Sequence, residues 1–210
     1  GIHESQSRLW ENNVGRSLPF WTYWFPKLQQ HFPQQLGNVS LQNFYKGINK
    51  VAPSLIRTEA DEVTYHFHVA IRYNLEKELI AGNLDADGIV PYWNSQYKNL
   101  LGVTVPGDKQ GALQDVHWSH GSFGYFPTYS LGSLYAAQFF AAAQKALPGL
   151  SQELRAGNTS PLLSWLRTHV HSEGKALESE DLCKKITGTG LDVPYFIQYL
   201  FEKYRLVYTL

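Results

Sequence analysis

The sequence predicts a mainly α-helical protein with at most a few short strands, which are expected near residues 54–58 and 113–117. Apolar residues recur every three or four positions over residues 62–81 and again over residues 127–147, which is the period of a helix with one buried face. Serine, aspartate, glycine and proline stand at positions where helices begin or end. With 210 residues, 43% of them hydrophobic, the chain is long enough to bury a substantial core, and we expect a single domain over residues 1–210.

The N-terminal helices are marked by prolines. A first helix is expected over residues 2–16, where apolar side chains are available for packing. Pro19 and Pro26 then interrupt an aromatic segment, because proline lacks the backbone N–H that a helix interior needs. The next helix is therefore expected only over residues 26–32, and Pro33 stops it.

A long central helix is the clearest single element. Before it, Ser40 is a favourable N-cap for a helix over residues 41–48, and residues 54–61 have a mixed local preference. The long helix is expected over residues 62–81, with Gly82 as its C-terminal stop. Its packing face is expected to contain Val63, Phe67, Ala70, Ile71, Leu75 and Leu79.

The middle of the chain combines one helix with a candidate functional loop. Residues 85–88 (Asp-Ala-Asp-Gly) resemble the start of a calcium loop but lack the required glutamate, so we interpret them as a turn. A helix is expected over residues 91–101, ending at Gly102. Residues 111–124 are rich in glycine, histidine, aspartate and serine, a composition typical of a loop that carries function.

The C-terminal part is expected to consist of helices. Pro194 lies near the first turn of the last of them, where proline is tolerated. The expected helices cover residues 127–147, 151–156 and 160–170, a short helix that begins at Glu178 and ends at Gly188 or Gly190, and a final helix capped by Asp192.

Composition excludes several classes of function. Eighteen basic and eighteen acidic side chains cancel, so no overall field attracts nucleic acid or an anionic membrane, and neither is expected as a partner. No apolar run approaches the roughly 20 residues that span a bilayer. Cys183 is the only cysteine, which excludes an internal disulfide and favours a reducing compartment. We expect a cytoplasmic protein.

Three groups of residues could carry chemistry. Glu4 follows His3 on a helix and is a plausible metal ligand, although the chain contains no HExxH pattern to supply further ligands. Arg57 has the planar guanidinium that binds a carboxylate through two hydrogen bonds, and a salt bridge to Asp61 is the alternative. The third group contains Gln114, Asp115, His117, His120, Tyr125 and Tyr129.

Histidine and tyrosine in the third group are suited to binding an oxyanion and to holding a peptide. Two alternatives remain open. Gln114 and Asp115 could simply brace the loop, and His117 and His120 could bind a metal as a pair.

Three motifs occur in the order of a known family. His3-Glu4-Ser5-Gln6, Ile56-Arg57-Thr58-Glu59-Ala60-Asp61 and Gly111-Ala112-Leu113-Gln114-Asp115-Val116-His117-Trp118 resemble signatures of the carboxypeptidase Taq family, and residues 165–171 and 199–204 resemble its C-terminal helices. The chain is similar to the C-terminal portion of those proteins, without the part that holds HExxH. The resemblance implies a helical zincin-type, neurolysin-like metallopeptidase fold.

The resemblance also implies roles for the residues. It makes Glu4 the third zinc ligand, with Co²⁺ as a possible substitute, and places Arg57 and Gln114 among the groups that bind substrate. His117, His120, Tyr125 and Tyr129 become the catalytic candidates, and all of these residues are expected to converge on one face.

The activity implied is the zinc-dependent release of C-terminal amino acids from peptides with a free carboxylate. The family's proteins are commonly dimers, so a homodimer is expected. This chain alone is expected to be inactive and to retain no zinc, because HExxH is absent. The alternative is a non-catalytic helical interaction module that retains the fold.

Overall fold

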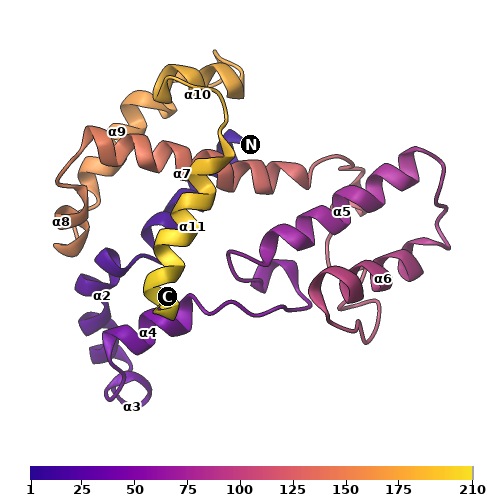
Figure 1. Ribbon diagram of the computed structural model, residues 1–210, viewed down its shortest axis with the longest axis horizontal. Coiled ribbons are helices and arrows are strands. Elements are labelled where there is room, and N and C mark those ends of the chain that lie inside the picture. The colour runs from indigo at the N-terminus through magenta and orange to yellow at the C-terminus, as the bar shows by residue number, and fades with distance from the viewer. Residues whose placement is uncertain (210) are drawn as a thin grey trace. The chain divides into compact units, whose positions relative to one another are not determined.

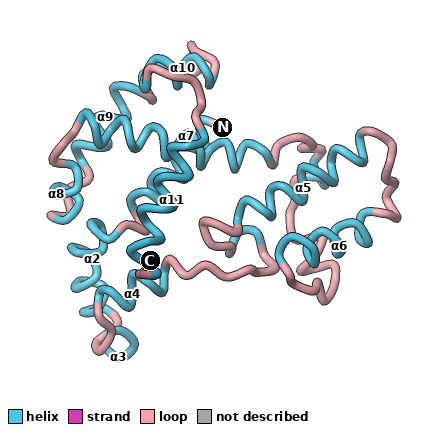
Figure 2. Tube along the Cα trace, viewed as in Figure 1, coloured by secondary structure: helices cyan, strands magenta, loops and turns pink. Residues whose placement is uncertain are grey.

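The computed structural model describes residues 1–209, in which every regular element is a helix and no strand occurs (Figures 1 and 2). The predicted fold class is therefore confirmed, and the short strands proposed near residues 54–58 and 113–117 are absent from the described chain. Close backbone contacts divide the chain into two compact units, residues 50–130 and the segments on either side of them. The expectation of a single domain stays a prediction.

The first unit combines the N-terminal and C-terminal helices. It begins with an α-helix, α1, that passes directly into a π-helix. The helices of this unit are α1 (Ile2–Arg8), η1 (Leu9–Val14), α2 (Leu18–His31), α3 (Pro33–Leu36), α4 (Leu41–Ile48), α7 (Pro127–Ala146, whose first four residues belong to the second unit), α8 (Leu150–Arg155), α9 (Ser160–His169), η4 (His171–Glu173), α10 (Ser179–Thr187) and α11 (Val193–Tyr208).

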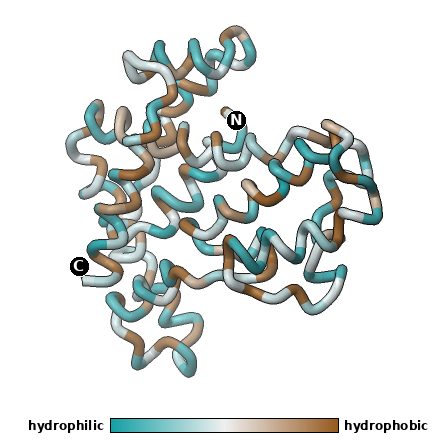
Figure 3. Tube along the Cα trace, turned by 45° about the vertical axis from the view of Figure 1, so that its right-hand side comes forward, coloured by the Kyte–Doolittle hydropathy of each residue, from teal (hydrophilic) through white to brown (hydrophobic). Residues whose placement is uncertain are grey.

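One buried cluster forms the core of this unit. Its members come mainly from η1, α7, α8, α9 and α10, and Phe139, Leu162 and Leu166 are completely buried. Hydrophobic and hydrophilic residues are interspersed along the helices of the chain (Figure 3), and the members of the cluster are the buried ones. Cys183 is buried in the same cluster, and burial raises the pKa of its thiol, which agrees with an inert structural role.

The prediction for α2 was wrong at its start. The helix begins at Leu18, because the Ser17 hydroxyl accepts a hydrogen bond from the Phe20 backbone N–H and Pro19 occupies the first turn, where it is tolerated. Pro26 lies inside the helix instead of beginning it. The expected stop is confirmed, since α2 ends at His31 before Pro33.

The π-helix frees a carbonyl that the last helix binds. A π-helix replaces the usual i to i+4 bonds with wider ones, and Gly15 N donates to Trp10 O at 2.8 Å. The Asn12 carbonyl accepts hydrogen bonds from the Tyr199 hydroxyl at 3.0 Å and from Lys203 Nζ at 3.3 Å. These contacts hold η1, the end of the N-terminal helix, against α11.

The second unit is built on two packed helices. In Figure 1, α5 and α6 lie side by side, and a buried group containing Ile71, Leu75, Trp93 and Tyr97 joins them. The helices that begin in this unit are η2 (Arg57–Glu59), α5 (Tyr65–Ile80), α6 (Ile89–Leu101), η3 (Trp118–His120) and the first turn of α7.

The buried face of α5 agrees with the prediction at Ile71 and Leu75, which are fully buried, but differs at Phe67. Phe67 is 42% exposed, whereas His68, Arg72 and Glu76, each four residues apart, are buried together with Ile71. Four-residue spacing places these three polar side chains on one side of the helix. Phe67 was predicted to be buried because it fits the spacing of the apolar residues. The buried side of this helix also contains polar residues, which that spacing does not reveal.

The other helix boundaries follow the predictions closely. Ser40 caps α4 by accepting from Asn43 N at 3.1 Å, and Gly102 and Gly188 end α6 and α10 with positive φ angles. Asp192 occupies the N-cap position of α11, but its side chain makes no capping hydrogen bond, so that part of the prediction was wrong. Within residues 1–209, no helix is both long and apolar enough to cross a membrane.

Candidate functional site

Glu4 lies on the first turn of α1, where α1 crosses α7 at close range. A Cβ atom added to Gly132 of α7 would lie 2.5 Å from Glu4 Cβ and 2.9 Å from the Glu4 carbonyl carbon. Ser5 is fully buried, and its hydroxyl donates to the Ile2 carbonyl at 2.6 Å. Glycine at position 132 therefore sets how close Glu4 comes to α7.

The metal-binding potential of the described residues is limited to single ligands. No three histidine, cysteine, aspartate or glutamate side chains of residues 1–209 come together in a group that could hold a metal ion. A zinc centre needs three or four such ligands. Glu4 could supply one carboxylate, but the described residues alone do not make up a zinc site. If His117 and His120 bound a metal as a pair, the described residues would supply no third ligand beside them.

A buried ion-pair group lies at the centre of the second unit. Asp115 Oδ1 accepts from Arg57 Nε at 3.0 Å and from Arg57 Nη2 at 2.7 Å. Asp115 Oδ2 accepts from Arg72 Nε at 2.6 Å, and Arg72 is fully buried. Arg57 Nη1 donates to the Tyr65 hydroxyl at 3.0 Å. Two guanidinium groups thus share one carboxylate.

The partner of Arg57 differs from the alternative considered above. The alternative salt bridge to Asp61 does not form; both oxygens of Asp61 instead accept from nearby backbone and hydroxyl groups, including Thr64 N at 2.8 Å and Ala52 N at 3.1 Å. An aspartate that accepts backbone N–H groups at the start of a helix acts as a cap. Asp61 therefore shapes the entry to α5.

The charges of this group shift the pKa values of its members. Burial opposes ionisation of Asp115, but the neighbouring Arg72 and Arg57 outweigh burial and lower the pKa of this carboxyl. Burial also opposes the charge on Arg57, yet the hydrogen bond and attraction to Asp115 raise its pKa. Burial, with the positive charges of Arg72 and Arg57, lowers the pKa of His68 to about 4, so His68 is neutral at pH 7.

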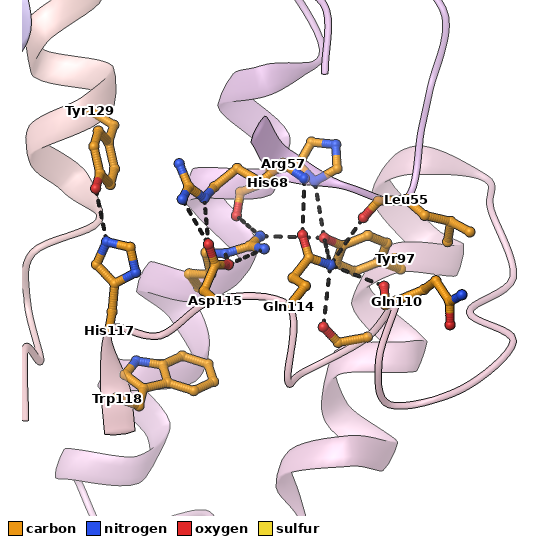
Figure 4. A network of polar contacts seen from close by, with 12 residues as sticks. Leu55, Arg57, His68, Tyr97, Gln110, Gln114, Asp115, His117, Trp118 and Tyr129 are labelled. Atoms are coloured by element: carbon orange, nitrogen blue, oxygen red, sulfur yellow. Dashed lines mark hydrogen bonds and ion pairs between the residues drawn. The ribbon is translucent and has the colours of Figure 1, made fainter. Parts of the chain in front are cut away.

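Gln114 links the loop to this group. Its Oε1 accepts from Arg57 N at 2.9 Å, while its Nε2 donates to the Leu55 carbonyl at 3.1 Å and to the Gln110 carbonyl at 3.0 Å (Figure 4). All three contacts are to backbone atoms. Gln114 thus braces the loop against the segment that carries Arg57.

His117 and the tyrosines complete a continuous cluster with Arg57. His117 Nε2 lies 2.8 Å from the Tyr129 hydroxyl, and the Tyr129 ring centroid lies 4.8 Å from the Arg57 guanidinium carbon. The ring of His117 lies 6.1 Å from that of His120 and 5.9 Å from that of Tyr125. Burial is the main cause that lowers the pKa of His117, which favours its neutral form.

The structure therefore brings together six of the seven predicted site residues: Arg57, Gln114, His117, His120, Tyr125 and Tyr129. Glu4 lies in the other unit, and its convergence with these six stays a prediction.

Sequence reasoning missed several polar residues that hold the cluster. Arg72 and Glu76 bind the loop through Asp115 and Trp118, and His68 and Arg72 both contact the Tyr97 hydroxyl. The signal was present as the four-residue spacing of His68, Arg72 and Glu76 on a helix. A polar stripe of this kind indicates a helix that faces a polar group as well as an apolar core.

Comparison with known proteins agrees with this picture. The sequence matches the family described as carboxypeptidase Taq (M32) metallopeptidase over residues 1–204. It is 46% identical over 208 residues to thermostable carboxypeptidase 1 of Thermus thermophilus and 43% identical over 210 residues to carboxypeptidase 1 of Bacillus subtilis. These matches cover 99% and 100% of this chain, and 41% and 42% of those proteins.

Solved structures give the same result. The M32 carboxypeptidase of Deinococcus radiodurans superposes with a TM-score of 0.95 at 43% identity, covering 100% of this chain and 42% of that one. A carboxypeptidase of Pyrococcus furiosus superposes with a TM-score of 0.91 at 38% identity, covering 97% and 41%. The chain thus spans about two fifths of the length of these relatives. By sequence and by fold, it belongs to the carboxypeptidase Taq (M32) metallopeptidase family.

Proposed function

We propose that this chain forms part of a zinc metallocarboxypeptidase that releases C-terminal amino acids from peptides, and that it is inactive alone. The observation that carries the proposal is the cluster in which Gln114, Tyr129 and His117 adjoin the buried ion-pair group of Arg57, Arg72 and Asp115. Family membership and relatives that are named carboxypeptidases support the reaction class.

The charge of the ion-pair group suits a substrate with a free carboxylate. Arg57, Arg72 and Asp115 together carry one excess positive charge, and Arg72 is fully buried. In a low-dielectric setting such a charge attracts an anion strongly. Arg57 donates one hydrogen of Nη1 to Tyr65 and one hydrogen of Nη2 to Asp115. Each of these nitrogens has a second hydrogen, which is proposed to bind a substrate carboxylate.

The His117–Tyr129 pair can present a proton to the reacting carbonyl. The His117 imidazole and the Tyr129 phenol are hydrogen-bonded at 2.8 Å, so each can supply a donor that stabilises an oxyanion beside the cluster. The other ring nitrogen, Nδ1 of His117, is buried without a hydrogen-bond partner, as suits an unprotonated nitrogen. His120 and Tyr125 lie next to this pair and are exposed, so they are proposed to contact the peptide.

Glu4 is proposed to be this chain's contribution to the metal site. When bound, zinc supplies an activated water and polarises the carbonyl. The remaining ligands and the general base would come from an HExxH segment that this sequence lacks. We also propose a homodimer for the complete enzyme. The alternative, a non-catalytic helical module, is favoured only by the lack of a complete ligand set among the described residues.

The carboxylate-binding role of Arg57 is tested with paired substrates. The chain is mixed with the N-terminal portion of a relative that carries HExxH, and hydrolysis of a peptide with a free C-terminus is compared with that of its C-terminal amide. We expect kcat/KM to fall by about a hundredfold or more for the amide, which lacks the charge that Arg57 binds.

The matched controls separate this effect from general damage. Acetylation of the peptide's N-terminus should leave kcat/KM unchanged. An Arg57→Lys enzyme keeps the charge but loses the planar pair of donors, so it should discriminate less between acid and amide. Equal hydrolysis of the free acid and the amide by the unaltered enzyme would contradict the proposed recognition.

A further inference from the structure

Glu76 is a buried carboxylate that binds both ends of one short loop segment. Its side chain lies on the buried side of α5, and the residue is 4% exposed. Glu76 Oε1 accepts from the indole nitrogen of Trp118 at 2.8 Å, and Oε2 accepts from Gly124 N at 3.1 Å. Neither donor carries a formal charge, so the contacts are charge-assisted hydrogen bonds to a loop and not an ion pair.

The two donors stand directly beside the candidate catalytic residues. Trp118 follows His117 in sequence, and Gly124 precedes Tyr125. Between them the chain turns back through the short helix η3 and through Gly121, whose φ of +80° favours glycine. One carboxylate therefore fixes the start and the end of this turn on a rigid helix.

We propose that Glu76 is a positioning residue, which sets the places of His117 and Tyr125 by holding Trp118 and Gly124. The inference rests on the proposed function for its catalytic consequence, while its structural part is independent of activity. The Trp118 ring supports the same arrangement, because it packs edge-on against Trp93 of α6 and against Phe126. Asp115 and Gln114 hold the loop before His117, but neither binds it after Trp118.

The substitution Glu76→Gln keeps the size of the side chain and alters its hydrogen bonding. An amide offers one acceptor oxygen and turns an NH₂ toward the second donor, so one of the two loop contacts is lost. The loss of a hydrogen bond to a charged group should raise the equilibrium constant for local opening of the loop roughly ten- to a hundredfold. Trp118→Phe removes the indole N–H that donates to Glu76 and keeps an aromatic ring at this position.

The structural part is measured on the 210-residue chain by amide hydrogen exchange. We expect exchange of the Gly124 amide and of residues 118–125 to accelerate roughly tenfold or more in Glu76→Gln, with α11 unchanged. The double variant Glu76→Gln/Trp118→Phe should be non-additive, since both residues belong to one hydrogen-bonded group. Unchanged exchange at Gly124 and residues 118–125 would overturn the brace itself.

Gln138 provides a matched control in the first unit. It is also fully buried on a helix, and it also binds a loop, through Thr187, Gly190 and Asp192. Gln138→Ala should accelerate exchange only in that loop. In the complemented enzyme it should lower stability without changing kcat per folded molecule.

The catalytic part is measured in the same complemented enzyme. Glu76→Gln should lower kcat roughly tenfold or more and change KM less than threefold, because the groups it positions act on the transition state. Faster loop exchange with an unchanged kcat would overturn the positioning role. If the unaltered complemented enzyme is inactive, the proposed function fails, and hydrogen exchange alone then decides whether Glu76 braces the loop.

Discussion

Single residues in the second unit are held by shared charges. Asp115 is the centre, since its two oxygens bind two arginines that come from different elements, and one of them, Arg72, is fully buried. Removing one member of such a group leaves a charge that is neither solvated nor paired. The loop that carries His117 follows Asp115 directly, so the same contact that stabilises the fold also places the site.

The first prediction concerns Asp115. Asp115→Asn keeps the shape but leaves the Arg57 and Arg72 charges unbalanced, so we expect unfolding free energy to fall by about 3–5 kcal/mol. Urea denaturation of the chain measures the change. The exposed pair between Lys185 and Glu173 is the control, and Glu173→Gln should cost less than about 1 kcal/mol. Equal effects of the two substitutions would contradict the account.

The second prediction concerns His68 and acid. Because the pKa of His68 is about 4 in the folded protein and near 6.5 in the unfolded chain, the unfolded state binds more protons between these values. Stability should therefore decline as pH falls from 6.5 to 4, by a total of about 3 kcal/mol from this residue. The lowered pKa of Asp115 adds a further loss only below its ordinary value of 3.8.

Denaturation at several pH values tests this window. The variant His68→Gln removes the largest of these contributions, so its stability should fall much less from pH 6.5 to 4, with a smaller slope left by the lowered pKa of His117. His169, an exposed histidine at the end of α9 and outside the ion-pair group, serves as the control. His169→Gln should keep the original dependence of stability on pH. An identical slope in His68→Gln would show that another group governs acid sensitivity.

At the scale of elements, close helix crossings and polar helix faces decide where the site residues lie. The crossing of α1 and α7 depends on one glycine, because any side chain at Gly132 would meet the backbone of Glu4. On α5, three polar residues at four-residue spacing direct the helix toward the loop instead of toward a purely apolar core.

The third prediction concerns this crossing. Gly132→Ala should push α1 from α7, destabilise the chain by about 1–3 kcal/mol and move Glu4. Gly47, on helix α4, has open space around it, so Gly47→Ala should be neutral or stabilise by up to about 1 kcal/mol. Thermal unfolding of both variants measures the difference. If alanine is tolerated equally at the two positions, the close contact does not govern the crossing.

Local sequence signals located most elements because capping residues and glycines act over a few positions. Ser40, Gly102 and Gly188 ended or began helices as predicted, since their preferences depend on nearby backbone. The start of α2 was missed because a proline usually begins or ends a helix, whereas Pro26 lies inside this one. Six of the candidate residues taken from the sequence motifs lie in one cluster, but the motifs did not include Arg72 or Glu76, whose contacts are long-range.

At the scale of the whole molecule, the chain consists of two compact units. The match to one family, over residues 1–204, includes residues of both. The first unit carries Glu4, and the second carries the loop with His117 and the arginine that is proposed to bind the substrate. Neither unit holds a complete set of metal ligands within the described residues. The proposed activity therefore requires the segment that supplies HExxH, and Glu4 is the residue through which this chain would join the metal site.

The most direct test of this account measures zinc and activity in one sample. The chain is combined with the HExxH-bearing portion, and its zinc content and its release of the C-terminal residue from a blocked dipeptide are measured. The same is done for Glu4→Gln and for the control Glu11→Gln. Glu11 is an exposed glutamate on the adjoining π-helix. We predict that the unaltered and Glu11→Gln complexes retain about one zinc and are active, whereas Glu4→Gln loses both together. A Glu4→Gln complex with full zinc and unchanged activity would contradict the central claim.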